Sequence, residues 1–240
     1  MGEQAKARLL AALERIRAQH AQRAASLQLA GRLDRLARFQ SRRLAATYAD
    51  LAREQRYAAA IAFFGSDIYG PGDFSRRDAD LARMVPSMVR LLPEDAVATF
   101  ADAMELSALA QELDRALDAF LAERPLTVRA YCQAFRAASG VAERERQIEL
   151  TVQVGRGLDR YVHAPLLRQA LHMMRVPARM AGLSALQRFL ERGVAAFARM
   201  KNADEFLETI RSRETAIMHA IFAGDDAAFA DPGDEASGPG

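Results

Sequence analysis

The residues with the clearest chemical potential lie in a short charged segment near positions 67–80. A Gly-Pro-Gly sequence at 70–72 separates two expected helices, and Arg76 and Arg77 fall in the first turn of the second one. Free backbone N–H groups at a helix start attract anions, so this segment could hold a small anionic ligand or an acidic peptide. The candidate contact residues are Asp67, Tyr69, Asp73, Arg76 and Arg77.

The same segment also has a purely structural interpretation, which we favour. Ser75 stands three residues before Asp78, which is the spacing of a capping box with Asp in the place of Glu. Cations at a helix start usually need compensating partners, so the two arginines would then pair with carboxylates. On this interpretation the segment is a tight corner between two helices.

Residue types that could carry catalysis or bind a metal are few and poorly spaced. None of the four histidines has an acidic residue three positions before it, as a di-iron bundle requires. Asp159 and His163 share a helix face, but two ligands are too few for a metal. Cys132, the single cysteine, is expected to be a buried and inert thiol. Residues 155–157 (Gly-Arg-Gly) lack the third glycine of a dinucleotide site, so we expect no catalytic residue.

A group of methionines beside a histidine could form a cofactor pocket, because both residue types can ligate haem or copper. The sequence has no Trp, however, and methionine at helical spacing usually fills space in such a core. We therefore expect no cofactor and no metal. The group comprises His172, Met173, Met174, Met180 and Met200.

Basic residues are concentrated at the start of the chain. Residues 1–60 carry twelve basic and five acidic side chains, a net charge of +7, whereas the remainder has a net charge of −5. Such a basic region could follow the phosphates of a nucleic acid. Few aromatic residues are interleaved and no known reading motif is present, so nucleic-acid binding is not expected. We favour either a solvated helix face or a helical hairpin that docks on the acidic remainder or on a second copy of the chain.

The pattern of apolar residues predicts an all-α protein. Leucine, isoleucine and phenylalanine recur at every third or fourth position, and no stretch alternates in polarity as a strand would. We expect an irregular bundle of eight to ten helices. The expected units are an Arg-rich helical region (1–52) that packs on or projects from the core, a main helical domain (53–224) and a disordered acidic tail (225–240).

The composition excludes several classes of protein. Half of the 240 residues are hydrophobic and 27% are charged, which is typical of a folded globular chain. One cysteine allows no internal disulfide and no multi-cysteine metal site. The sequence contains neither a secretory signal nor a membrane span, so we expect a cytoplasmic protein without membrane contact.

Several separate stretches resemble one known family. Positions 63–71 read Phe-Phe-Gly-Ser-Asp-Ile-Tyr-Gly-Pro, and positions 73–80 read Asp-Phe-Ser-Arg-Arg-Asp-Ala-Asp. Met-Arg-Val-Pro-Ala follows at 174–178 and Leu-Glu-Arg-Gly at 190–193. Together they resemble the bacterial FFLEELY-motif proteins, an uncharacterised family, over about residues 30–223. The resemblance implies an all-helical fold and a bacterial source, and it implies no mechanism.

The chain departs from that family at the naming motif. Where the family name has Leu-Glu-Glu-Leu, residues 65–68 read Gly-Ser-Asp-Ile. One carboxylate is therefore lost and the other is shortened to Asp67. A role that needed both carboxylates is not expected in this chain.

Two functions from different classes follow from these observations. The first is a non-catalytic interaction or regulatory protein, acting through a protein partner or by self-association through its N-terminal helices. The alternative is a small-ligand-binding protein or an enzyme with a pocket near the Gly-Pro-Gly corner at 70–72. A deep pocket lined by Asp67, Tyr69 and a polar partner from another helix would favour the alternative, and a filled core with an exposed apolar stripe would favour the first.

Overall fold

The computed structural model describes residues 2–68, 75, 78–84, 94–163, 169, 171–200 and 202–233. Within these residues there is no strand, and eight α-helices have nine or more residues, which confirms the predicted all-α, multi-helix fold. The elements, in chain order, are α1 (Gly2–Ala24), α2 (Leu27–Thr47), α3 (Ala49–Arg53), α4 (Gln55–Phe63), the π-helical turn η1 (Phe64–Ile68), α6 (Glu94–Leu121), α7 (Val128–Ala138), α8 (Val141–Val162), α10 (Arg175–Met180), α11 (Ser184–Phe197) and α12 (Asp204–Phe222).

Local capping explains where several helices begin. The Ser26 hydroxyl accepts a hydrogen bond from the backbone of Leu29 at the start of α2, and Thr127 does the same for α7. Each side chain satisfies a backbone donor that the helix itself cannot. Asn202 and Glu205 have the spacing of a capping box, but none forms at the start of α12. Asn202 accepts from the backbone of Asp204, two residues on, and Glu205 accepts from the Tyr57 hydroxyl of α4.

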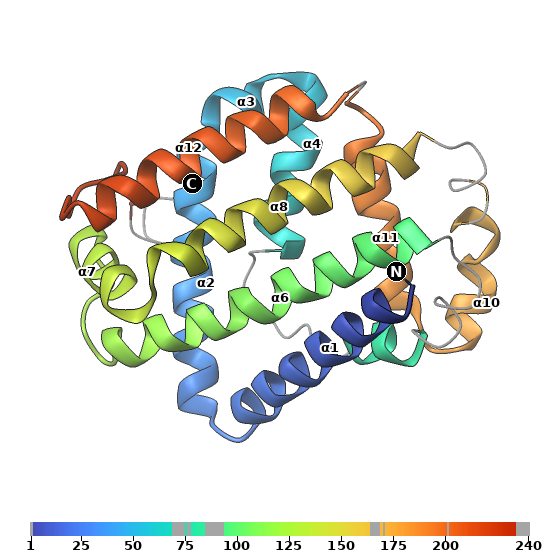
Figure 1. Ribbon diagram of the computed structural model, residues 1–240, viewed down its shortest axis with the longest axis horizontal. Coiled ribbons are helices and arrows are strands. Elements are labelled where there is room, and N and C mark those ends of the chain that lie inside the picture. Colours follow the sequence, from blue (N-terminus) through green and yellow to red (C-terminus); the bar gives the residue numbers. More distant parts are fainter. Residues whose placement is uncertain are drawn as a thin grey trace, which may run out of the picture.

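The long helices α6, α8 and α12 run side by side, and α2 crosses behind them (Figure 1). α8 lies between the other two and contacts both. This arrangement brings residues from distant parts of the chain to the space between α2, α8 and α12. None of the described helices is both long enough and apolar enough to cross a bilayer.

The first helix lies along α6 (Figure 1). Its apolar stripe of Leu9, Leu13 and Ile16 is buried together with apolar residues of α6 and α11. Arg8 pairs with carboxylates of α6, as does Arg15 further along. The basic start of the chain thus docks on an acidic helix of the same molecule. Self-association through the N-terminal helices stays a prediction, and it would have to use surfaces other than this stripe.

The main apolar cluster joins α3, α4, α8, α11 and α12. Tyr57, Phe197 and Phe206 are each at most 1% exposed, and the rings of Tyr57 and Phe206 stack with centroids 5.3 Å apart. Gly155 of α8 lets this helix approach α12 closely, because a Cβ atom there would lie 2.4 Å from a methyl group of Leu207. The glycines at 155 and 157 therefore serve helix packing.

The C-terminal segment differs from the expectation of disorder from position 225. Residues 225–233 pack on the bundle, and residues 234–240 lie outside the described part of the chain. The ring of Phe229 meets those of Phe39 and Tyr131 at centroid distances of 6.3 and 5.7 Å. Asp226 accepts a hydrogen bond of 2.7 Å from Arg136. One aromatic ring and one matched charge thus anchor a segment whose composition is otherwise acidic and rich in alanine.

Candidate functional site

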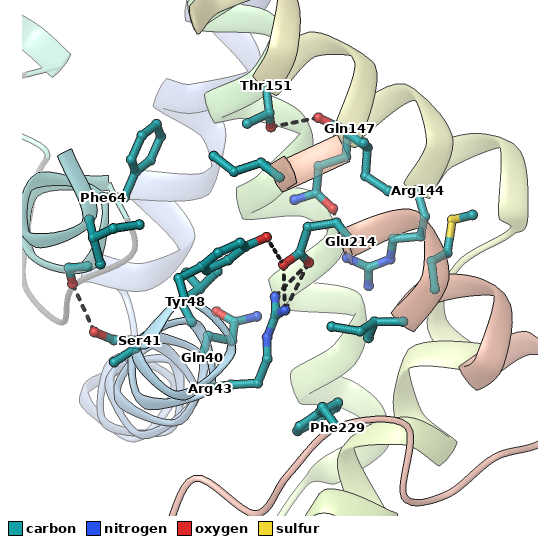
Figure 2. Close-up of a pocket in the computed structure, with 18 of the residues that line it drawn as sticks. Gln40, Ser41, Arg43, Tyr48, Phe64, Arg144, Gln147, Thr151, Glu214 and Phe229 are labelled. Carbon is teal, nitrogen blue, oxygen red and sulfur yellow. Dashed lines mark hydrogen bonds and ion pairs between the residues drawn. The ribbon is translucent and has the colours of Figure 1, made fainter. Parts of the chain in front are cut away.

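A cavity of about 270 Å³ lies between α2, α4, η1, α7, α8 and α12. Its wall is mostly apolar, and its polar groups come from three helices that are far apart in sequence (Figure 2). The polar lining residues include Gln40, Arg43, Tyr48, Arg144, Gln147 and Glu214. Because ligand sites are typically apolar pockets with a few convergent polar groups, this cavity is the leading candidate for a functional site.

An ion pair between Arg43 of α2 and Glu214 of α12 crosses this cavity wall (Figure 2). Arg43 donates through both terminal nitrogens to the Glu214 carboxylate over 2.7–2.9 Å, and the Tyr48 hydroxyl donates to the same carboxylate over 2.7 Å. Burial opposes the charge on Arg43, but Glu214 outweighs it, so the pKa of Arg43 is raised. Arg43 is therefore charged at neutral pH.

A second arginine, Arg144 of α8, lines the same cavity and is only 4% exposed. Its Nε donates to the Ser139 hydroxyl over 2.9 Å, and its Nη1 donates to the Gln147 side chain over 3.1 Å. The guanidinium lies over the Phe135 ring, 3.8 Å from the centroid. Its Nη2 is buried and has no hydrogen-bond partner among the described residues.

Neutral and weakly ionising groups lie close to these arginines. Gln40 donates to Asp114 over 2.8 Å, and burial raises the pKa of that carboxyl group. Burial also raises the pKa of the Tyr131 hydroxyl, which therefore stays protonated at neutral pH. Tyr131 therefore supplies no anion to the cavity, and Asp114 is not among its lining residues.

The apolar end of the cavity is built partly by the motif at 63–68. Phe64 and Gly65 of the π-helical turn η1 line the wall, next to Ile61 of α4. The Ser41 hydroxyl of α2 donates to the Gly65 carbonyl over 2.9 Å (Figure 2). A π-helical turn leaves carbonyl groups out of the regular α-helical pattern. This bond therefore satisfies one of them and fixes the turn against α2.

The structure describes only part of the charged segment at 67–80 that the sequence analysis singled out. Asp67 does not line the cavity, because its carboxylate pairs with Arg192 of α11 at 2.8 Å. The other candidates, Tyr69, Asp73, Arg76 and Arg77, lie outside the described residues, as does the Gly-Pro-Gly corner at 70–72.

Asp78, expected to cap a helix, has a partner in the first helix of the chain. It is 3% exposed, and its carboxylate lies 2.9 Å from Nε2 of His20 in α1. Both residues line a second hollow of about 330 Å³, together with Ser75 and residues of α1. Because His20 and Asp78 satisfy each other, this hollow offers less to a ligand than the cavity around Arg144 does.

The described residues contain no group of three or more His, Cys, Asp or Glu side chains that could hold a metal. His163 lies 3.4 Å from Asp159 as an ion pair on one helix. The methionines do not gather at one place, because Met173 and Met180 are 63% and 85% exposed while Met200 is fully buried.

Cys132 is fully buried, and burial raises the pKa of its thiol to about 11. The thiolate is the reactive form, so the folded protein should protect this residue. We expect its reaction with an aromatic disulfide reagent at pH 8 to be at least about a hundredfold slower in buffer than in denaturant. Equal rates in the two conditions would show that the site opens freely.

Sequence reasoning missed the three ionised residues at the centre of the cavity. Arg43 was grouped with the other basic residues of the N-terminal region, and Glu214 has no distinctive neighbours. Arg144 carried a usable signal, because Ile148 and Thr151 follow it at helical spacing on the same face. An arginine in line with an inward-facing isoleucine indicates a buried cation.

The fold is all-α, and a cavity with charged residues in its wall lies between its helices. A family model described as a domain of unknown function (DUF8198) matches residues 19–228, and the chain belongs to this family. No curated protein and no solved structure gave a match.

Proposed function

We propose that this protein binds a small organic molecule in the cavity between α2, α8 and α12 and acts without catalysing a reaction. The observation that carries the proposal is the cavity itself, about 270 Å³ in volume and close to the lower end of known ligand pockets. An apolar wall with a few polar groups at one end is the usual composition of such pockets.

The polar groups support binding rather than catalysis. Arg43, Tyr48 and Glu214 are occupied with one another, and Cys132 does not line the cavity. Among the described lining residues, no nucleophile lies next to a histidine that could act as its base. A change in the packing of α2, α8 and α12 when the ligand binds would give the protein a regulatory role. Contact with a protein partner stays a prediction.

The proposal also covers the source and the cellular location of the protein. The resemblance to the FFLEELY-motif family favours a bacterial source. A single buried thiol is compatible with a reducing compartment, so we place the protein in the cytoplasm. Nucleic-acid binding has little support, because Arg8, Arg15 and Arg43 all pair with carboxylates of the same chain.

The cavity is tested with 1-octanol as a small apolar probe. Gly65→Leu places a larger side chain on the wall, where a Cβ atom meets only the Ser41 hydroxyl at 3.6 Å. We expect octanol to raise the melting temperature of the wild-type protein and to lose this effect in Gly65→Leu, because binding to the folded state stabilises it. Gly31→Leu is the matched control, since a Cβ atom at position 31 meets nothing within 4 Å.

Two results would contradict the proposal. One is the absence of any octanol effect on the wild-type protein. The other is an undiminished effect in a folded Gly65→Leu variant. If that variant does not fold, amide NMR of the wild-type protein replaces it. Octanol should then shift the signals of cavity residues such as Ile148 and Ile217 and leave those of α1 unchanged.

A further inference from the structure

The unusual feature of the cavity is that a buried cation faces it without an anion to match. Arg144 points from α8 toward the Arg43–Glu214 pair (Figure 2). Its contacts among the described residues are the neutral side chains of Ser139, Gln147 and Phe135. No carboxylate of the described chain lies within ion-pair distance of Arg144.

The charges around the cavity do not balance. Two arginines line it, but Glu214 is the one carboxylate among the described lining residues, and Arg43 and Tyr48 already occupy that carboxylate. Asp114 interacts electrostatically with Arg144, but it does not line the cavity, and burial raises the pKa of its carboxyl group. The described lining residues therefore include one more arginine than carboxylates.

The position of Arg144 in its helix increases this excess. It is the fourth residue of α8, next to the end of the helix that carries a partial positive charge. The acidic residue of that first turn, Glu143, is held by the backbone N–H of Gly140 at 2.8 Å. A cation at this end of a helix is unfavourable unless an anion accompanies it.

Burying a charge without a partner is costly, and a protein seldom retains such a charge unless it serves a function. Phe135 covers one face of the guanidinium, and Ser139 and Gln147 use two of its nitrogens. The remaining donor, Nη2, is suited to a carboxylate oxygen, because charge-assisted hydrogen bonds are the strongest that arginine makes.

We propose that the ligand is a monocarboxylate with a compact apolar body, and that Nη2 of Arg144 donates to its carboxylate. This inference rests on the proposed ligand-binding function of the same cavity. The apolar body would lie along Ile61, Phe64 and Ile148. A volume of about 270 Å³ suits a short or medium acyl chain or a single ring better than a long-chain lipid.

Octanoate and 1-octanol test the inference as a matched pair, because they share an eight-carbon chain and differ in charge. We expect octanoate to bind the wild-type protein at least tenfold more tightly than octanol, which corresponds to about 1.4 kcal/mol. Arg144→Met keeps the apolar stem over Phe135 and removes the charge. In this variant the preference for octanoate should disappear while octanol still binds.

Arg156→Met is the control, since it removes an arginine from an exposed position of the same helix. It should leave the preference for octanoate unchanged. We also expect Arg144→Met to melt at or above the wild-type temperature without ligand, because it removes an unpaired buried charge. If Arg144 were needed only for folding, the Arg144→Met substitution would lower the melting temperature.

The outcomes separate this inference from the proposed function. If octanol binds as tightly as octanoate, the carboxylate is not recognised and only the present inference fails. If neither probe binds, the cavity is not a binding site and both proposals fail. If Arg144→Met does not fold, side-chain NMR of wild-type arginines decides the question. Octanoate, and not octanol, must then shift the Nε–Hε signal of Arg144.

Discussion

Glu214→Gln is expected to lower the free energy of unfolding by about 3 to 5 kcal/mol, one of the two largest effects we predict. Arg43 would keep its charge, because an arginine is not deprotonated in a folded protein at neutral pH. With its side chain only 13% exposed, that charge would lose its partner without gaining contact with water. The measurement is urea denaturation followed by circular dichroism at pH 7.

We attribute the loss of stability in Glu214→Gln to the unpaired charge of Arg43, and two further variants test this cause. Adding Arg43→Met to Glu214→Gln should recover most of the lost stability, since an apolar residue replaces the stranded cation. Asp50→Asn is the comparison. It removes the partner of Arg213, which also lies on α12, but the Asp50 side chain is 56% exposed. We expect it to cost at most about 1 kcal/mol. Equal losses for the two single variants would refute the argument.

Gly155→Val is expected to destabilise the protein by about 3 kcal/mol, the upper part of the range for overpacked cores. A Cβ atom at this position would lie 2.4 Å from Cδ2 of Leu207, which is fully buried where α8 and α12 cross. The helices must separate or Leu207 must leave its favoured conformation. Thermal and urea unfolding of the variant measure the loss.

A second substitution decides whether this close contact is the cause. In a double variant, Leu207→Ala should make room for the valine, so the combined loss should be smaller than the sum of the two single losses. Gly31→Val is the control, because that position of α2 is exposed and meets nothing within 4 Å. It should change stability by no more than about 0.5 kcal/mol. Additive losses would show that position 155 acts through something other than Leu207.

Helix formation could be predicted because its determinants are local. The stripe of Leu9, Leu13 and Ile16 follows the helical repeat, and Thr127 caps α7 as its sequence position indicates. The hydrogen-bond partners of side chains were harder to predict than the helices. Glu205 has the spacing of a capping residue but bonds to Tyr57, a residue that only the packing of α4 brings near.

The candidate site was less predictable than the fold. Sequence reasoning favoured the charged segment at 67–80, where Asp67 proves to pair with Arg192 and most other candidates lie outside the described residues. The cavity lies instead between helices from separate parts of the chain, with α2 beginning at Leu27, α8 at Val141 and α12 at Asp204. Its charged residues are unremarkable within their own helices, and their environment depends on what packs around them.

The sequence by itself determined the class of this protein, because helical periodicity, capping residues and the absence of alternating strands depend only on near neighbours in the chain. It also determined that basic residues are concentrated in the first sixty positions. Tertiary structure alone decided that Arg43 meets Glu214, that Arg144 faces a cavity without a carboxylate, and that Phe229 anchors the C-terminal segment. Burial and the pairing of charges arise only when distant helices pack together, and local sequence does not encode that packing.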